Sequence, residues 1–366
     1  MTSVIEKPAA IAAPAKRPGM RSVLQRQRWW LGRVAVLPLH LLVFVLLSFV
    51  LIRSVPGDPV AALLGSQAWT QADYDQLEKS LGLDGSLLEQ LVRYVGGLFT
   101  LDLGRSLVTR QEVWDELAVR LPATVELALM GMIVCIVVSI VASLIVLSRP
   151  RGIIAKIIGG YSRAAGAVPD FVLAIAGLLL FYATLRWVPA PLGRLDTTLI
   201  APTRITGLPF TDTILQGYGA ATASMAAHLV LPVAVLALSQ APIMINLLIA
   251  GLRQSLDAPP TLFRIATGAG RRTVLLSVYR RAIPAVITIS GSIFGSLIGG
   301  AVIVESLFGF SGLGSYAADA VSGSDYPALQ GFLLLVAALV LVVFLLVDVV
   351  NMVVDPRRRP GNHQEG

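Results

Sequence analysis

The 366-residue sequence has few charged residues, few histidines and a single cysteine. Charged residues make up 14% of the chain, whereas a soluble domain keeps about a quarter of its residues charged. Together with a mean hydropathy of +0.76, this composition excludes an ordinary soluble globular protein. Cys135 cannot form a disulfide within the chain, so cysteine content does not indicate a redox compartment. His40 and His228 have no second ligand at metal spacing, and we predict no metal site.

A nucleotide-binding loop is also missing. The motif G-x-x-x-x-G-K-[ST] does not occur in the chain, so any ATP would have to be bound by another subunit. The sequence therefore predicts no cofactor on this chain. The net charge of +7 follows the membrane topology described below and does not indicate nucleic-acid binding.

Long apolar runs are what the sequence has instead. A bilayer span needs roughly 20 mostly apolar residues. None of the runs alternates between apolar and polar residues, so helices are the spanning structure that they favour. We therefore predict an all-α integral membrane protein with six transmembrane helices. The third window begins with Pro169 and Asp170 and is the least typical of the six windows, which lie near residues 36–55, 123–147, 167–185, 226–250, 285–304 and 331–354.

The basic residues orient these spans. They concentrate in the tail 1–34, in the connection after the second span, in 251–284 and in the C-terminal tail, whereas residues 305–330 contain no Lys or Arg. The positive-inside rule then places both termini and the loop 251–284 in the cytoplasm. We expect 56–121 and 186–224 to be extracytoplasmic, 35–359 to form the transmembrane domain and 360–366 to be a short tail.

Two of these segments have patterns of their own. Within 56–121, "QADYDQLEKSLGL" and "GSLLEQLVRYVGGLF" repeat apolar residues at three-to-four spacing, which predicts surface helices. The segment 186–224 is rich in Pro, Gly and Thr and predicts irregular structure.

The cytoplasmic stretch "FRIATGAGRRTVLLSVYRRAIPAV", residues 263–286, is the most unusual part of the sequence. It contains five arginines and no acidic residue. Val274, Leu275, Val278 and Ile283 lie on one stripe and predict a short amphipathic helix. Gly268 and Gly270 would break the chain before this helix, and Pro284 would end it and begin the next span. Anionic lipid, phosphate or a partner protein could each bind such a segment.

The same stretch resembles a known family. "RIATGAG", residues 264–270, is similar to the cytoplasmic EAA loop of permease subunits of binding-protein-dependent ABC importers, in the dipeptide/oligopeptide/nickel family. Further stretches resemble that family in its order: "PGDP" (56–59), "LGLD" (81–84), "LDLGRSL" (101–107), "RLPATVELAL" (120–129), "HLVLP" (228–232), "GAVIVESLFGFSGLG" (300–314), "DYPALQG" (325–331) and "LLVDVVNMVVDPRRR" (345–359). The run from Gly270 to Pro284 is shorter than in peptide permeases, and the 34-residue tail has no counterpart.

The resemblance implies a type I importer permease in the cell membrane that imports di- or oligopeptides and is not an enzyme. Nickel chelates, haem or another small solute are the alternative cargoes. Its implied partners are a second homologous permease, two ATP-binding subunits that carry ATP and Mg²⁺, an extracytoplasmic binding protein and membrane lipid. The implied ATPase-coupling residues are Arg264, Ala266, Gly268, Gly270, Arg271, Arg272 and Pro284.

Three acidic residues are candidates for the translocation path or an outer gate: Glu126, Glu305 and Asp325. Ionisable groups at or within spans are costly and often functional. The alternative without a functional role is that Glu126 and Glu305 reach water at the outer ends of their spans or make structural hydrogen bonds. Gly291, Gly295, Gly299 and Gly300 are spaced for close helix packing.

Two other classes of protein fit less well. "GFSG", residues 309–312, matches the G-x-S-G of rhomboid-type intramembrane proteases, which also have six spans. However, a nucleophilic serine needs a base within reach, and the one histidine after Ser311 is His363, predicted on the other side of the membrane. A secondary transporter would show inverted repeats, and none is evident.

Overall fold

The structure is a computed structural model in which residues 38–50, 59–64, 69–80, 83–164, 166 and 168–354 are described. The predicted tails 1–34 and 360–366, and most of "PGDP", lie outside the described residues. The described part is helical and contains no β-strand beyond an isolated bridge between Arg105 and Glu112. This confirms the all-α class.

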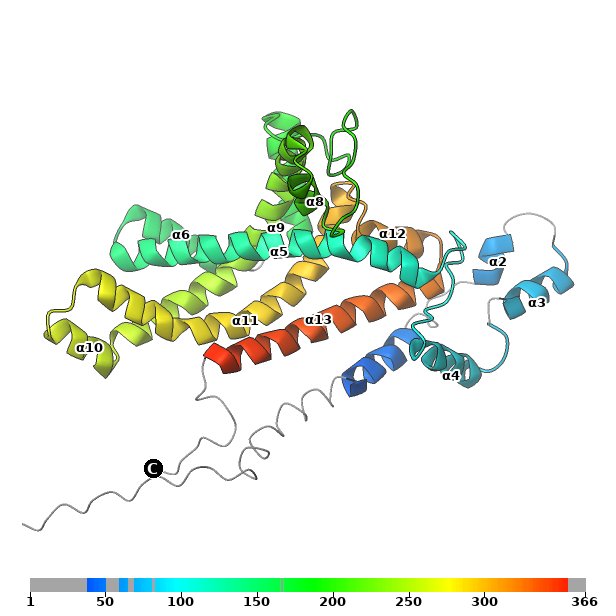
Figure 1. The fold of residues 1–366 in the computed structure, drawn as a ribbon, viewed down its shortest axis with the longest axis horizontal. Coiled ribbons are helices and arrows are strands. Elements are labelled where there is room, and N and C mark those ends of the chain that lie inside the picture. Colours follow the sequence, from blue (N-terminus) through cyan, green and yellow to red (C-terminus); the bar gives the residue numbers. More distant parts are fainter. Residues whose placement is uncertain are drawn as a thin grey trace, which may run out of the picture.

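The described part begins with a helix Pro38–Val50 and continues through a series of helices of very different lengths (Figure 1). These are α2 Pro59–Leu64, α3 Gln71–Ser80, α4 Leu87–Leu98, α5 Val113–Ser148, α6 Ile153–Ala164, α7 Asp170–Gly177, the π-helix η2 Leu178–Thr184, α8 Pro209–Leu215, α9 Gly219–Leu256, α10 Pro259–Ala266, α11 Arg271–Leu307, α12 Leu313–Ser322 and α13 Tyr326–Val354. Helices α3 and α4 confirm the two surface helices that were predicted, and Ser86 begins α4 with a capping box to Glu89.

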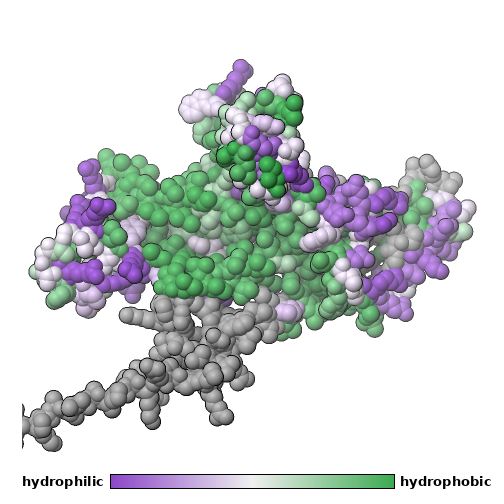
Figure 2. Space-filling model, viewed as in Figure 1, coloured by the Kyte–Doolittle hydropathy of each residue, from purple (hydrophilic) through white to green (hydrophobic). Residues whose placement is uncertain are grey.

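In the described part of the chain, four helices are long and apolar enough to cross a membrane, namely α5, α9, α11 and α13. The first and third predicted windows coincide with the shorter apolar helices Pro38–Val50 and Asp170–Thr184. All six windows are thus helical where they are described, while a count of six spans stays a prediction. Figure 2 shows an apolar belt across the middle of the molecule, with hydrophilic residues gathered towards both ends.

The two ends of the molecule are built from different elements. Helices α5, α11 and α13 run along the long axis, with α6 and α10 at one end and α2, α3, α4 and α12 towards the other (Figure 1). We call these the α10 end and the α12 end. They matter for function because each end presents a distinct group of polar side chains, as described below.

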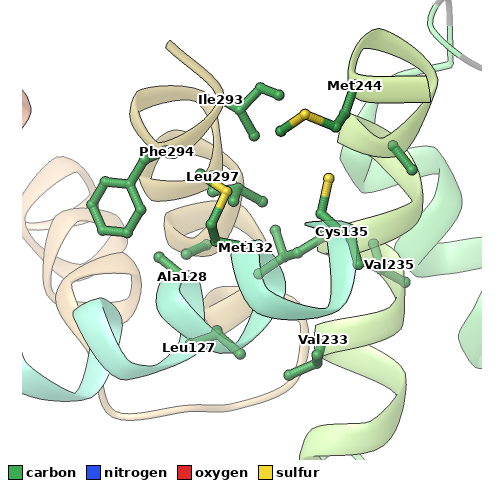
Figure 3. Close-up of a cluster of buried hydrophobic side chains, with 14 of the residues drawn as sticks. Leu127, Ala128, Met132, Cys135, Val233, Val235, Met244, Ile293, Phe294 and Leu297 are labelled. Atoms are coloured by element: carbon green, nitrogen blue, oxygen red, sulfur yellow. The ribbon is translucent and has the colours of Figure 1, made fainter. Parts of the chain in front are cut away.

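The core forms where α5, α9 and α11 meet. Figure 3 shows Met132 and Cys135 of α5 close to Met244 of α9 and Leu297 of α11. Gly131 permits this approach, because a Cβ there would lie 3.1 Å from the Cβ of Leu236. Cys135 is fully buried and serves as a small apolar core residue.

The other side of α5 is apolar and exposed. Ile133, Val137 and Val141 recur every four residues and are 60%, 54% and 50% exposed. A helix that is apolar on its outward face as well as in the core is typical of a membrane environment, where lipid or another membrane subunit covers the outer stripe.

The glycines of α11 pack against neighbouring helices, as their spacing predicted. A Cβ at Gly291 would lie 3.1 Å from Phe344 of α13, and one at Gly295 would lie 3.4 Å from Val340. Gly300 faces α7 and α9 at still closer range, whereas Gly299 has no neighbouring atom within 4 Å. Small side chains at three of the four positions therefore let α11 approach its neighbours.

Pro284 does not end a helix, so that prediction is wrong. Helix α11 continues through it from Arg271 to Leu307. Val274, Val278 and Ala282 form a buried stripe that joins the main core, and this packing outweighs the backbone hydrogen bond that proline removes. Ile283, which was predicted on the same stripe, is 42% exposed.

Candidate functional site

Thr261 ties the α10 segment to the rest of the molecule. The prolines Pro259 and Pro260 occupy the first turn of α10, where a missing N–H costs nothing. Thr261 follows and is fully buried. Its hydroxyl donates to the carbonyl of Ser255 at 2.7 Å and accepts from Arg281 Nη1 at 2.9 Å. Helix α10 is therefore tied both to the end of α9 and to α11.

The remaining face of α10 points away from the molecule. Leu262, Phe263 and Ile265 are 53%, 69% and 52% exposed. Arg264 and Ala266 are exposed beside them. A short helix that carries three uncovered large apolar side chains at the hydrophilic end of the protein is suited to contact a partner surface.

The sharp bend after α10 is at Gly268 and not at Gly270. Gly268 has φ +79°, and the N–H groups of Gly268 and Ala269 donate to the carbonyls of Ile265 and Arg264 at 3.0 and 2.9 Å. This is the hydrogen-bond pattern of a Schellman helix end, which favours glycine at the left-handed position. Gly270 has φ −59° and ψ 148°, a conformation open to any residue, and it precedes α11.

Arg271 and Arg272 begin α11 and are exposed. Positive side chains at a helix N-terminus oppose the helix dipole, so these two arginines do not serve the stability of α11. The structure thus brings six of the predicted coupling residues together at the α10 end, namely Arg264, Ala266, Gly268, Gly270, Arg271 and Arg272. Pro284 lies thirteen residues into α11, about 20 Å along its axis.

At the α12 end, Glu305 and Glu126 are joined through an arginine that the sequence analysis missed. Arg194 Nη2 donates to Glu305 Oε1 at 2.9 Å and to the carbonyl of Ala123 at 3.0 Å. Its Nη1 lies 3.9 Å from Glu126 Oε2. The Arg194 guanidinium also stacks over the Phe310 ring at 4.7 Å.

Glu305 is completely satisfied inside the protein. The hydroxyl of Thr124 donates to both carboxylate oxygens at 2.9 Å, and the N–H of Gly314 donates to Oε2 at 2.9 Å. A Cβ at Gly312 would lie 2.1 Å from Glu305 Oε1, so the neighbouring turn must carry glycine there. The stretch "GFSG" forms part of this turn, with Gly309 at φ +67°.

Glu126 holds the start of α8. It accepts the N–H groups of Phe210 and Thr211 at 2.9 Å and the hydroxyl of Thr211 at 2.8 Å. The alternative that Glu126 and Glu305 reach water at the ends of their spans is wrong, because they are 4% and 0% exposed, whereas the alternative of structural hydrogen bonds is confirmed. Both carboxylates can be buried because Arg194 and the N–H and hydroxyl groups of the adjoining loops replace their hydrogen bonds to water.

We call Glu126, Arg194 and Glu305 the outer cluster. Burial lowers the pKa of the Arg194 guanidinium, and the two carboxylates beside it oppose that shift. A guanidinium remains charged at any physiological pH. The outer cluster therefore ties the loop containing Arg194 to α5 and α11 by charge-assisted hydrogen bonds.

Asp325 belongs to a separate contact. Its carboxylate accepts from the Ser106 hydroxyl at 2.5 Å and from the N–H groups of Val108 and Ala328 at 3.3 and 3.1 Å. It thus caps the start of α13 and holds the loop 103–110 against it. The structure unites two of the three acidic candidates and leaves Asp325 apart from them.

A cavity of about 770 Å³ opens beside the outer cluster. It lies between the first turns of α5, the loop 192–209 and the turn at Gly309 and Ser311. Among the described residues, no group of three metal-ligating side chains occurs in it or elsewhere. His228 Nδ1 instead pairs with the carbonyl of Ser224 at 2.8 Å.

Comparison with known proteins assigns the family. Residues 136–360 match the model of the binding-protein-dependent transport system inner membrane component, and residues 26–128 match the N-terminal part of such membrane components. The first match alone covers more than half of the chain.

Curated relatives agree over nearly the whole chain. A di/tripeptide transport system permease protein of Pseudomonas aeruginosa is 32% identical over 315 residues, which cover 86% of this chain and 93% of the relative. A probable D,D-dipeptide transport system permease protein of Escherichia coli is 31% identical over 333 residues, covering 91% and 96%. A dipeptide transport system permease protein of Escherichia coli is 30% identical over 318 residues, covering 86% and 93%. The chain therefore belongs to the binding-protein-dependent transport system inner membrane component family, and is a multi-pass membrane permease subunit without a catalytic site of its own.

Proposed function

We propose that this permease forms half of the translocation pathway of an ABC importer for di- or oligopeptides. The observation that carries the proposal is the exposed face of α10, with Leu262, Phe263 and Ile265 uncovered and arginines on both sides. Such a face fits the groove of a partner subunit. The peptide cargo is supported by the relatives, whose names specify dipeptides and di/tripeptides.

The partners follow from this role. A single chain supplies one half of the pathway, so a second homologous permease is expected to pack against the exposed apolar stripe of α5. Two ATP-binding subunits, which carry ATP and Mg²⁺, would dock at the α10 end. An extracytoplasmic binding protein would deliver substrate to the α12 end, which comprises residues from 56–121 and 186–224.

Helix α11 provides a direct mechanical connection between the two ends. Its 37 residues extend from Arg271, beside α10, to the helical turn that carries Glu305, and span about 55 Å. Force applied to α10 by closure of the ATPase pair passes to α11 through the bond between Thr261 and Arg281. Movement of α11 would then pull Glu305 relative to Arg194 and Glu126. In this mechanism the contacts of the outer cluster break and form again with each ATPase cycle.

Uptake by the purified complex tests the function. The permease is reconstituted in vesicles with its partner subunits and its binding protein, and labelled dipeptide and tripeptide are supplied outside. ATP-dependent accumulation of peptide is the expected result. Accumulation of a nickel chelate or haem with no uptake of peptide would instead establish one of the alternative cargoes.

Cysteine labelling tests the proposed orientation. Val321→Cys in α12, where Val321 is 64% exposed, should react with an impermeant thiol reagent added outside intact cells. Thr273→Cys in the first turn of α11 should react only after the membrane is opened. The native Cys135 is buried and provides a silent background. Labelling of Thr273→Cys but not Val321→Cys from outside would reverse the topology.

The two glycines of the coupling segment should respond differently to substitution. Gly268→Val places a β-branched residue at φ +79°, which costs about 1–2 kcal/mol or more, and it displaces α10. We expect substrate-stimulated ATP hydrolysis to fall several-fold while the chain still inserts. Gly270→Val is the matched control, because Gly270 has an extended backbone and no neighbour within 4 Å. Equal, undiminished stimulation in both variants would mean that this bend does not position the coupling helix.

A further inference from the structure

The cavity at the α12 end has a charge pattern that the outer cluster does not explain. Three acidic and three basic side chains line it, together with apolar and backbone groups: Asp115, Glu116, Asp212, Arg120, Arg194 and Arg204. Its volume of about 770 Å³ falls within the roughly 300–1,000 Å³ of small-molecule sites. The question is which of these charges are free to meet a ligand.

Most of the charges are already matched inside the protein. Arg120 pairs with Glu116 one turn earlier on α5, with Nη2 3.7 Å from Oε1, and donates to the carbonyl of Glu116 at 2.9 Å. Arg194 is held by Glu305 at 2.9 Å. A carboxylate of the protein therefore balances the charge of each arginine, and neither is available to pair with a charged ligand.

Asp212 is likewise satisfied by its own loop. Its carboxylate accepts the N–H and hydroxyl of Thr206 at 2.8 and 2.7 Å and the N–H groups of Ile205 and Gly207 at 3.3 and 3.1 Å. It shapes the loop 205–212 that forms one wall of the cavity.

Two charges of opposite sign are left over. Within the described part of the chain, Asp115 forms no hydrogen bond and no ion pair, and its side chain is exposed. Arg204 is exposed, and among the residues that the structure describes its one hydrogen-bond partner is the carbonyl of Val119, which it reaches through Nη2. Both side chains line the same cavity.

A free short peptide is a zwitterion at neutral pH, with an ammonium at one end and a carboxylate at the other. It therefore carries one charge of each sign to pair with Asp115 and Arg204. We propose that the cavity binds zwitterionic di- and tripeptides, with Asp115 facing the terminal ammonium and Arg204 facing the terminal carboxylate. The side chains of the peptide would lie over the apolar lining, which includes Leu192, Leu195 and Met225.

Arg194 also borders this cavity. Its side chain is 9% exposed and lies in the cavity wall. Its Nε and Nη1 have no hydrogen-bond partner among the described residues. Both atoms are buried, and Nη2 is bound to the carbonyl of Ala123 and to Glu305, so Arg194 is a structural part of the cavity wall.

This inference rests on the proposed function, since it names the place where the imported peptide first contacts the permease. The test uses the complete complex in lipid nanodiscs without its binding protein. Binding of dialanine is measured by saturation-transfer NMR and compared with N-acetyl-dialanine and dialanine amide, which lack one terminal charge each.

The proposal predicts a specific pattern of losses. N-acetylation should weaken binding to the wild-type complex about tenfold, the usual effect of one charge-assisted hydrogen bond. The Asp115→Asn complex should bind dialanine about as weakly as the wild-type complex binds the acetylated peptide. In this variant, acetylation should change the affinity by less than about twofold. In Arg204→Gln, dialanine should bind about as weakly as dialanine amide binds to the wild-type complex. Amidation should then make little further difference, whereas N-acetylation should still weaken binding.

Matched controls lie on α3, outside the cavity. Asp75→Asn and Lys79→Gln remove exposed charges of the same two signs and should leave all three affinities unchanged. Equal binding of the three peptides by the wild-type complex, or an undiminished acetylation effect in Asp115→Asn, would overturn the proposal. If the Asp115 and Arg204 variants lose binding-protein docking and show no change in peptide binding, the cavity is a docking site for that protein and the proposal is wrong.

These results separate the two levels of inference. Peptide uptake with the binding protein, combined with no binding of dialanine to the complex alone, would refute the cavity and leave the proposed function intact. Failure of peptide uptake in vesicles would refute the function itself.

Discussion

Glu305→Ala should lower the free energy of unfolding by about 3–5 kcal/mol. Glu305 is fully buried and matches the charge of Arg194, which is 9% exposed. Removing the carboxylate leaves the buried guanidinium with Glu126 at 3.9 Å as its nearest acidic partner. It also orphans the hydroxyl of Thr124 and the N–H of Gly314, which both donate to Glu305. The loss combines an uncompensated charge with unsatisfied buried donors.

Unfolding of the purified protein in mixed micelles, followed by circular dichroism during titration with sodium dodecyl sulfate, measures this loss. Glu112→Ala is the matched control, because Glu112 pairs with Arg105 at 2.7 Å but the two side chains are 44% and 72% exposed. Exposed pairs contribute at most about 1 kcal/mol. A Glu305→Ala loss no larger than the Glu112→Ala loss would show that the outer cluster does not hold this end of the molecule together.

Phe263→Asp should reduce the amount of ATPase subunit that co-purifies with the permease by at least tenfold. Phe263 is 69% exposed on α10 and is the largest of its three uncovered apolar side chains. Burying such a ring in a partner's groove contributes about 1.5–3 kcal/mol, and placing an unpaired carboxylate there costs more. Each 1.4 kcal/mol is a tenfold change in affinity.

Thr261 and the core contacts of α11 do not involve Phe263, so the permease itself should fold and insert normally. Ile205→Asp is the matched control, because Ile205 is a similarly exposed apolar residue at 62% but lies in the segment before α8, far from α10 (Figure 1). If as much ATPase subunit co-purified with Phe263→Asp as with the wild-type permease, α10 would not be the docking helix. Equal loss with Ile205→Asp would indicate a general defect in assembly.

The stretch 263–286 has some features that its own sequence predicts and others that depend on tertiary contacts. Gly268 and Gly270 predicted a break in the chain before a helix, and α10 does end and α11 begin there. Which glycine takes the left-handed backbone depended on where α10 ends, and that end is set by the anchoring of Thr261 to Ser255 and Arg281. Pro284 shows the same limit, because the buried stripe of Val274, Val278 and Ala282 keeps α11 continuous across a residue that breaks helices in isolation.

By itself, the sequence determined the membrane class, the positions of the apolar helices, the surface helices α3 and α4 and the membership of the permease family. These are local properties, since apolar length, helical periodicity and short motifs are each written in a few tens of neighbouring residues. The tertiary structure alone decided how the charged residues pair. Glu305 and Arg194 are 111 residues apart in the chain, and no periodicity relates them. Their pairing exists because the packing of α5, α11 and the loop 186–208 brings three charged groups into one dry site, where each must find its partner within the protein.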